Sequence, residues 1–422
     1  MTERLLQFIW QFQYFNRNEL QTETGESLQI IQSGQYNTNQ GPDFLEASIR
    51  VENTVLAGSI ELHIQSSDWN KHQHQADINY NNVILHVVWE DDAKNCLSSV
   101  PTLVLQNRIA KSLLIRYDEW MQQQAFVPCA TSLTSVNTLV WISWKERLLA
   151  ERLQRKAESI LQLLASNHYH WEETFWQLLA RNFGMKINAE MFENIAKSLP
   201  VTMLAKHKNQ LITLEALLLG QAGLLQGSFK EQYPQLLQRE YIFQQNKYKL
   251  IQPAGQVYFL RMRPAAFPGI RLVQLAMLVH RAVHLFAQVK EAVELKEVLQ
   301  LLDITANDYW HYHYIPDEPS VYKIKHLGTD MVHNIIINTI VPVLFTYGLY
   351  HKDQPVKDKA LNWLAEINAE KNNLIKSWQQ LGITAEHAYD SQALIELKTQ
   401  YCDNRKCLDC AIGNALLKVS IR

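Results

Sequence analysis

The sequence predicts an α+β protein that has a mixed sheet with flanking helices in its N-terminal part and a large all-α part after it. Apolar and polar residues alternate over 45–51 and 54–64, as in strands that cover a core with one face. The segment 83–89 is almost continuously apolar, which is typical of a strand covered on both faces. From about residue 110 onward, apolar residues recur at helical spacing almost to the end of the chain.

The N-terminal domain is expected over residues 1–115. It begins with a helix over 4–18, whose aromatic and aliphatic residues form one wide face. Three strands follow, then a polar crossover over 68–82 and two more strands. The expected strands cover 28–31, 45–51, 54–64, 83–89 and 102–106.

A helical domain is expected over 116–400, and a cysteine-containing segment follows over 401–422. The apolar stretch 335–350 is interrupted by Asn338, Thr339 and Pro342 and is short for a membrane span, so it predicts a buried helix. The other predicted helices cover 144–164, 171–179, 191–198, 211–225, 231–245, 273–288, 292–302, 358–378 and 391–397.

Composition limits the function classes. The chain has 422 residues, 47% of them hydrophobic, which suits two or three folded domains. Lys and Arg total 40 and Asp and Glu total 42, so nucleic acid would have to bind through a local basic patch. The first residues do not resemble a signal peptide, and the cysteine count of five is odd. We therefore expect a protein of the reducing cytoplasm that does not enter a membrane.

Two acidic residues mark a candidate metal site on neighbouring predicted strands. Asp43 follows Gly41-Pro42 at the start of one strand, and Glu61 lies in its hairpin partner. His63 is two positions beyond Glu61 and so faces the same side of that strand. Carboxylates and water are ligands that Mg²⁺ prefers. The pattern predicts that Asp43 and Glu61 bind Mg²⁺ or Mn²⁺, and that His63 orients or deprotonates the attacking water.

This order of helix, strand, Pro-Asp, strand, Glu-x-His, helix and strand resembles the core of the PD-(D/E)XK nuclease superfamily. The matching motifs are Pro42-Asp43 and Glu61-x-His63. The resemblance implies a restriction-endonuclease-like fold, Asp43 and Glu61 as Mg²⁺ ligands, and nucleic acid as substrate. The chain departs from the pattern at His63, where a lysine would be expected, so the site is either a variant or a lost one.

A second resemblance covers the whole chain. The segments Gln40-Gly41-Pro42-Asp43-Phe44 and 80–88, together with the cysteine tail, resemble an uncharacterised bacterial domain-of-unknown-function family. This resemblance implies no established activity.

The polar crossover is rich in histidine. His72, His74 and Asp77 lie within it, and His63 and His86 lie on the flanking strands. Imidazole with carboxylate suits Zn²⁺, Mn²⁺ or Fe²⁺. Three interpretations remain open. The histidines are solvated loop side chains, or His72 or His74 contacts the substrate phosphate beside the metal, or the group binds the metal of an enzyme that acts on a small molecule.

The cysteine tail has the spacing C-x4-C-x2-C, formed by Cys402, Cys407 and Cys410. The two-residue gap lets two thiolates reach one ion, and Cys129 is the best remote candidate for a fourth ligand. We expect a structural Zn²⁺ or an iron–sulfur cluster, because four thiolates leave no open position for catalysis. The alternative is a set of buried cysteines without a metal.

Basic and aromatic residues supply candidate substrate contacts. Arg261 and Arg263 flank a rigid proline turn, and guanidinium groups suit phosphate. Trp69, next to the candidate site, either stacks on bases or packs in the core. A basic helix face either follows a nucleic-acid backbone or is a solvated surface with i,i+4 ion pairs; its residues are Arg147, Arg152, Arg155 and Lys156.

Several reaction classes are disfavoured because their motifs are missing from the sequence. It contains no phosphate-binding loop of the G-x-x-x-x-G-K-[ST] type, no H-E-x-x-H and no G-x-S-x-G. The working hypothesis is divalent-metal-dependent hydrolysis of phosphodiester bonds in nucleic acid. One alternative is a non-catalytic nucleic-acid-binding or scaffold protein with a degenerate nuclease-like fold. The other is a His/carboxylate metalloenzyme that acts on a small molecule.

Overall fold

The computed structural model describes residues 1–72, 77–93, 100–260, 262–282 and 284–419. The chain forms two compact units. The first consists of Met1–Glu146, Lys376–Thr384 and Ile395–Arg422, and the second of Arg147–Ile375 and Ala385–Leu394. The boundary expected near residue 115 therefore lies inside the first unit, which also takes in the cysteine tail.

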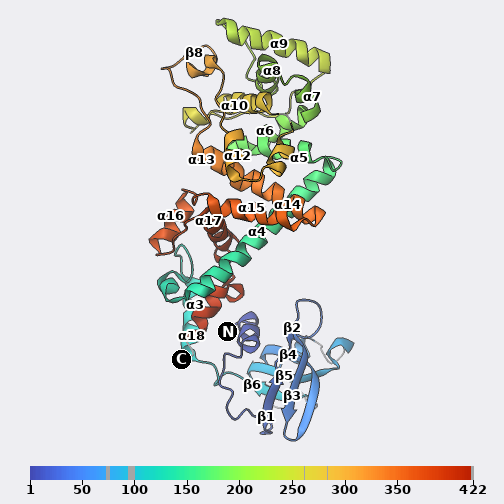
Figure 1. Cartoon of the computed structure of the whole chain (residues 1–422). Helices are drawn as coiled ribbons and strands as arrows, with labels where there is room; N and C mark the ends of the chain where they lie inside the picture. The colour runs from blue at the N-terminus through green and yellow to red at the C-terminus, as the bar shows by residue number, and fades with distance from the viewer. Residues whose placement is uncertain (73–76, 94–99, 261, 283, 420–422) are drawn as a thin grey trace. The chain divides into compact units, whose positions relative to one another are not determined.

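A six-stranded mixed sheet forms the blue and cyan part of Figure 1. Its main strands lie in the order β1 (Leu28–Gln32), β3 (Phe44–Val51), β4 (Thr54–Gln65), β5 (Val83–Glu90) and β6 (Thr102–Val104), and the short β2 (Gln35–Tyr36) pairs with β3. The pairs β1–β3 and β3–β4 are antiparallel, whereas β4–β5 and β5–β6 are parallel. The predicted order of helix, strands and crossover is confirmed, and β2 is an addition to it.

The crossover between the parallel strands β4 and β5 contains two short helical segments, α2 (Asp68–Lys71) and the 3-10 helix Ile78–Tyr80. Asp77 begins the second of these, and its carboxylate accepts the backbone N–H of Asn79. The crossover thus returns the chain to the same end of the sheet, as a parallel pair requires.

Helix α1 (Glu3–Gln11) packs on β4 through buried side chains that include Leu5, Leu6 and Ile9. Thr2 caps its first turn by accepting the N–H of Leu5. The helix was expected to reach residue 18, and this was wrong. It ends at Gln11 because Gln13 adopts a left-handed backbone with φ of 55°, which stops the helical hydrogen-bond pattern.

The C-terminal segment belongs to the first unit. Helix α18 (Ala411–Val419) packs against α3 (Lys111–Gln122) and against the 3-10 helix Ala130–Ser135. Tyr14 donates its hydroxyl to the side chain of Asn414 at 2.6 Å, and Arg116 donates to the carbonyl of Leu416 at 2.8 Å. Residues separated by about three to four hundred positions in the sequence therefore share one core.

The described residues of the second unit form helices and one short hairpin, made of β7 (His313–Ile315) and β8 (Glu318–Pro319). Helix α4 (Thr138–Ser166) enters it at Arg147. The other helices are α5 (Trp171–Phe183), α6 (Met185–Ser198), α7 (Val201–Lys206), α8 (Leu211–Gln221), α9 (Gln232–Tyr248), α10 (Pro268–Arg281), α11 (Leu285–Glu291), α12 (Leu295–Leu301), α13 (Thr329–Ile335), α14 (Val341–His351) and α15 (Gln354–Glu366). Two more pass between the units, α16 (Asn373–Gln380) and α17 (Ala388–Glu396).

Two predicted helices are divided in the structure. The segment 273–288 forms parts of α10 and α11, because His284 has φ of 63° and begins a new helix. The segment 358–378 forms parts of α15 and α16, because the chain leaves the helix at the extended residue Ile367.

The apolar stretch predicted to be a buried helix lies in the continuous helical segment Thr329–His351. A π-helical turn, Ile336–Ile340, joins α13 to α14. In the described residues this is the one helix long and apolar enough to cross a membrane, but 67% of its apolar window is buried inside the protein. Its packing is therefore that of a core helix.

Helix α8 packs against α9 and α10 and buries a carboxyl group. Glu215 has no exposed surface, and its Oε2 accepts hydrogen bonds from the Tyr233 hydroxyl at 2.8 Å and the Trp310 indole at 2.9 Å. Burial raises the pKa of Glu215 to about 7, although the two hydrogen bonds oppose the shift.

Glu215 makes the stability of the second unit depend on pH. Because its folded-state pKa lies above the unfolded value, its contribution to stability is complete below about pH 4.5 and is lost as pH rises to about 7. We expect a loss of about 1.4 kcal/mol for each pH unit in this range. Urea unfolding at pH 5, 6, 7 and 8 should show this slope, and Glu215→Gln should reduce it. Equal slopes in the two proteins would contradict the prediction.

Candidate functional site

The two predicted carboxylates meet at the start of β3. Asp43 precedes this strand, Glu61 lies in β4, and the pairing of Phe44 with Ile60 places them side by side. The backbone N–H of Asp43 donates to Oε2 of Glu61 at 3.0 Å, and the N–H of Leu62 donates to Oδ2 of Asp43 at 3.0 Å. Each strand therefore holds the carboxylate of the other by a backbone hydrogen bond.

Helix α1 completes the surroundings of Asp43. The amide of Gln7 donates to Asp43 Oδ1 at 2.8 Å, and the Tyr36 hydroxyl donates to Gln7 Oε1 at 3.2 Å. Glu61 is buried at 5% exposure, whereas Asp43 is only partly buried. Asp43 is thus the more accessible member of a rigidly held pair.

The electrostatics of the pair favour a neutralising partner. Burial is the largest cause that raises the pKa of both Asp43 and Glu61, and the charge of Asp43 raises the pKa of Glu61 further. Glu3, at the start of α1, adds a third negative charge that raises both pKa values. The pKa of Tyr80 is raised to about 12, first by burial and then by the nearby Glu61 and Asp43. A proton or a cation would relieve this concentration of negative charge.

His63 lies beside the carboxylates and within a line of imidazoles. It is 1% exposed, and its Nε2 is 3.7 Å from Glu61 Oε1. Its Nδ1 is 2.8 Å from His86 Nε2, and its Nε2 is 3.2 Å from His72 Nδ1. His86 is fully buried and His72 is exposed, so the line runs from the interior to the surface.

The histidines meet as hydrogen-bond partners of one another. Over residues 1–72, 77–93, 100–260, 262–282 and 284–419, no group of three or more His, Cys, Asp or Glu side chains has a geometry that could hold a metal ion. His74 lies outside the described residues. Asp77 caps a helical turn, as described above. The pair of Asp43 and Glu61 needs no third protein side chain, because Mg²⁺ retains water and takes oxygens from a substrate.

Trp69 packs within the site. It is 4% exposed, and its ring contacts His63 at a centroid distance of 6.4 Å, His86 at 5.2 Å and Tyr80 at 6.3 Å. Base stacking and core packing were both open for Trp69, and its burial favours packing against the imidazoles. His72 lies beside His63, as described above, whereas the two arginines expected to contact a substrate come later in the chain. Arg263, in the second unit, precedes the 3-10 helix Pro264–Ala266, and Arg261 is outside the described residues.

All four predicted cysteines belong to the first unit and are free thiols. Cys129, Cys407 and Cys410 are buried. Burial is the main cause that raises the pKa of Cys129 and Cys407 to about 12, and it also raises the pKa of Cys402. The other three cysteines raise the pKa of Cys402 further, so the four thiols are electrostatic neighbours.

Cys410 is buried next to several N–H groups. This residue immediately precedes α18, and the backbone N–H groups of Ile412 and Gly413 and the nearby Trp144 indole lower the pKa of its thiol. Burial outweighs them and raises the pKa to about 11. A Cβ on Gly413 would lie 2.2 Å from the carbonyl oxygen of Cys407, so only glycine permits this close turn.

Sequence reasoning missed Glu3, Gln7, Tyr36 and Tyr80 as parts of the site. Glu3 and Gln7 are four positions apart and therefore share a face of α1, which is the one local signal that links them. Nothing in the sequence indicates that this face meets Asp43, because the contact joins residues separated by 36 positions.

Replacing the Glu61 carboxyl group should stabilise the metal-free protein. We expect Glu61→Gln to raise the unfolding free energy of the first unit by about 2 kcal/mol at pH 8. Burial and the charge of Asp43 raise the pKa of Glu61 well above its usual range, so folding at that pH must desolvate or protonate this group, and a glutamine avoids that cost. Thermal and urea unfolding without divalent metal would measure the gain. Glu90→Gln, at the exposed end of β5, is the matched control and should leave stability unchanged. A Glu61→Gln protein less stable than this control would contradict the prediction.

Comparison with curated proteins and with solved structures finds no match. A family model described as "Protein of unknown function (DUF2851)" matches residues 3–373. This match includes the sheet, the paired carboxylates and nearly all of the second unit. The chain therefore belongs to the DUF2851 family.

Proposed function

We propose that this chain is a divalent-metal-dependent hydrolase that cleaves phosphodiester bonds in nucleic acid, with Asp43 and Glu61 as ligands of Mg²⁺ or Mn²⁺. The observation that carries the proposal is the pair itself. Two carboxylates from adjacent strands are held together at a cost in desolvation and repulsion that a bound dication would offset. Groups that destabilise a fold in this way are typical of functional sites.

The arrangement of elements supports the same proposal. A helix, antiparallel strands, a crossover and a parallel strand follow one another in the order that the resemblance to PD-(D/E)XK nucleases implies. Asp43 and Glu61 lie on the strands where that resemblance places the metal ligands. Carboxylate oxygens are also the donors that suit a hard cation.

The residues around the pair would divide the work of hydrolysis. A bound metal ion would lower the pKa of water and offset negative charge on the phosphate. Gln7 orients Asp43 through its hydrogen bond, and Leu62 holds the other oxygen of the same carboxylate. His63 takes the place of the lysine, and we assign it the role of accepting a proton at Nε2. From there His72 Nδ1, at 3.2 Å, would carry the proton to the surface.

Two alternatives lead to different results. A binding or scaffold protein would keep the fold without hydrolysis, and the net charge of −2 and the missing lysine favour it. A His/carboxylate metalloenzyme would need its histidines to face one ion, whereas the described ones hydrogen-bond to one another. We also propose a cytoplasmic location, which the free thiols of the cysteine group support.

Cleavage assays test the proposal directly. We expect the wild-type protein with Mg²⁺ or Mn²⁺ to cut labelled single- or double-stranded DNA or RNA. Glu61→Ala should lose at least about 100-fold in rate, because it removes a metal ligand. Glu90→Gln should retain the wild-type rate. If a folded wild-type protein loaded with Mn²⁺ cuts none of the substrates, the binding or scaffold alternative replaces the proposal.

We further propose that Cys129, Cys402, Cys407 and Cys410 hold a structural Zn²⁺ or iron–sulfur cluster. Four thiols are the donor set that a thiophilic metal prefers, and the N–H groups directed at Cys410 would stabilise a thiolate. In the described residues the four sulfurs do not form a metal-binding geometry, so metal binding would require their side chains to move together. Elemental analysis of the protein purified without chelator should find zinc or iron, and Cys407→Ser with Cys410→Ser should lose it and lower the melting temperature. Wild-type protein without either metal would contradict this proposal and leave the nuclease proposal intact.

A further inference from the structure

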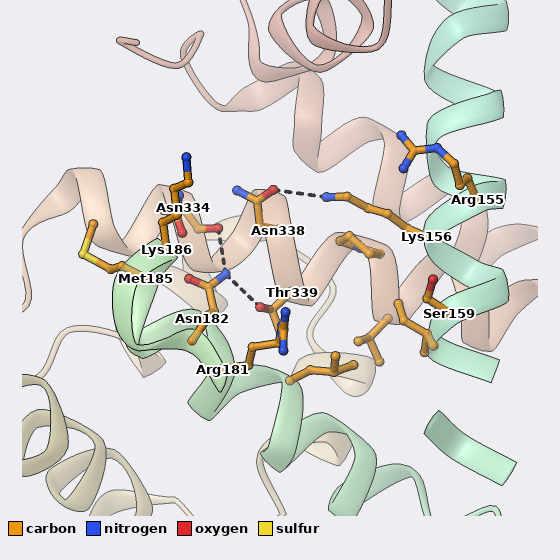
Figure 2. Close-up of a pocket in the computed structure, with 15 residues that line it drawn as sticks. Arg155, Lys156, Ser159, Arg181, Asn182, Met185, Lys186, Asn334, Asn338 and Thr339 are labelled. Carbon is orange, nitrogen blue, oxygen red and sulfur yellow. Dashed lines mark hydrogen bonds between the residues drawn. The ribbon is translucent and has the colours of Figure 1, made fainter. Parts of the chain in front are cut away.

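A cavity in the second unit has a charge pattern unlike that of the chain as a whole. Its volume is about 530 Å³, and Figure 2 shows the fifteen residues that line it. Four of them are cationic, namely Arg155, Lys156, Arg181 and Lys186. None of the fifteen, all of which the structure describes, is acidic. In a chain of net charge −2, this is a local excess of positive charge at one concave surface.

Three segments of helix supply the basic residues. Arg155 and Lys156 come from α4, Arg181 from the end of α5, and Lys186 from the first turn of α6. The junction of α5 and α6 is unusually tight. A Cβ on Gly184 would lie 2.5 Å from the carbonyl oxygen of Asn188, and Met185 has φ of 52°. This junction places Arg181 and Lys186 on the same wall, and a strained residue there is a frequent mark of a functional site.

Two of these cations have partners that define their place in the wall of the cavity. Arg181 and Lys197 share one carboxylate, that of Glu193, so one negative charge faces two positive ones. Lys156 donates to a neutral group, Asn338 Oδ1, at 3.1 Å, as Figure 2 shows. The first turn of α6 contains no acidic residue and its N-cap has no side-chain hydrogen bond, which adds the partial positive charge of a helix N-terminus.

The π-helical turn provides the polar floor of the cavity. Pro342 has no N–H and its ring would collide with the carbonyl of residue 338 in a regular helix, so the chain widens into the π turn Ile336–Ile340. Thr339 in this turn accepts a hydrogen bond from Asn182 Nδ2 at 2.9 Å. The Nδ2 also reaches the carbonyl of Asn334, at 3.4 Å. Asn182 Oδ1, by contrast, is buried without a partner among the described atoms.

The unpartnered Asn182 Oδ1 indicates that a ligand of this cavity carries a hydrogen-bond donor as well as an anionic group. Such an oxygen lowers the stability of the fold unless a hydrogen-bond donor reaches it. The remaining wall is apolar and includes Ile160, Leu178 and Val343. The cavity therefore combines cations for an anionic group, an acceptor for an N–H or O–H donor, and an apolar surface for a planar or aliphatic part.

We propose that this cavity binds a free nucleoside phosphate. Its phosphate would contact the basic residues, led by Lys186 and Lys156. Its base would lie against the apolar wall and donate an amino or imino N–H to Asn182 Oδ1. The volume of about 530 Å³ suits a molecule of this size. This inference does not rest on the proposed hydrolysis, because binding needs neither Asp43 nor a metal ion.

Titration calorimetry of the full chain without divalent metal would test the proposal. The probes are the four ribonucleoside monophosphates and the corresponding diphosphates, with unphosphorylated nucleosides and inorganic phosphate as partial ligands. We expect at least one nucleotide to bind at least tenfold more tightly than its nucleoside and than phosphate. Lys186→Glu should weaken it by at least tenfold, because the exposed side chain adds an anion to the wall without disturbing the core.

Lys206→Glu is the matched control, since it makes the same charge change at an exposed position of α7 outside the cavity. It should leave the dissociation constant within about twofold. Equal losses in the two variants would indicate general charge attraction and overturn the proposal. Equal affinity for nucleoside and nucleotide would also overturn the proposal. Binding of an oligonucleotide without binding of any free nucleotide would overturn it too, because the cavity would then be part of a groove that binds a nucleic-acid strand.

Discussion

The two hydrogen bonds that cross between β3 and β4, from Asp43 N–H to Glu61 and from Leu62 N–H to Asp43, are the constraint on which the N-terminal unit depends. Each carboxylate accepts a backbone N–H from the other strand, so the start of β3 is fixed against the middle of β4. Burial raises the pKa of both groups, and the packing of α1 on the sheet offsets the free energy lost by desolvating them. The geometry is rigid because hydrogen bonds hold the acids in place, and it is unstable because their charges are close.

The same constraint explains the layers around the pair. Gln7 reaches Asp43 only because α1 packs on β4, and the N-cap at Thr2 determines where that helix begins. On the other side, Trp69 fills the space beside the imidazoles, which keeps His63 within 3.7 Å of Glu61. The positions of Asp43, Glu61 and His63 thus follow from ordinary helix capping and aromatic packing.

Much of this unit was predictable because its determinants are local. The turn between β3 and β4 and the alternation along both strands predict the pairing of the two strands, but this register alone would place Asp43 opposite Leu62. A β-bulge between Phe44 and Ala47, where Glu46 has φ of 58°, shifts the register by one residue and brings Asp43 beside Glu61. The helix ends were harder to predict from the sequence, because Gln13 and His284 adopt left-handed backbones although neither is glycine. Glu3 and the contact of α18 with α3 depend on packing between distant segments, which no periodicity encodes. Trp69 has an aromatic ring that suits a base as well as a core, and only its burial distinguishes the two roles.

The first unit is built from discontinuous parts of the chain, with the second unit inserted between them. A ribosome therefore releases α1, the sheet and α3 long before α18 emerges to cover them. During that interval the apolar surfaces of α3 and the 3-10 helix Ala130–Ser135 lack their C-terminal cover, whereas the second unit has nearly all of its own residues. The first unit is thus complete only after the second has been made, whereas the hydrogen bonds that hold the paired carboxylates come from residues synthesised at the start.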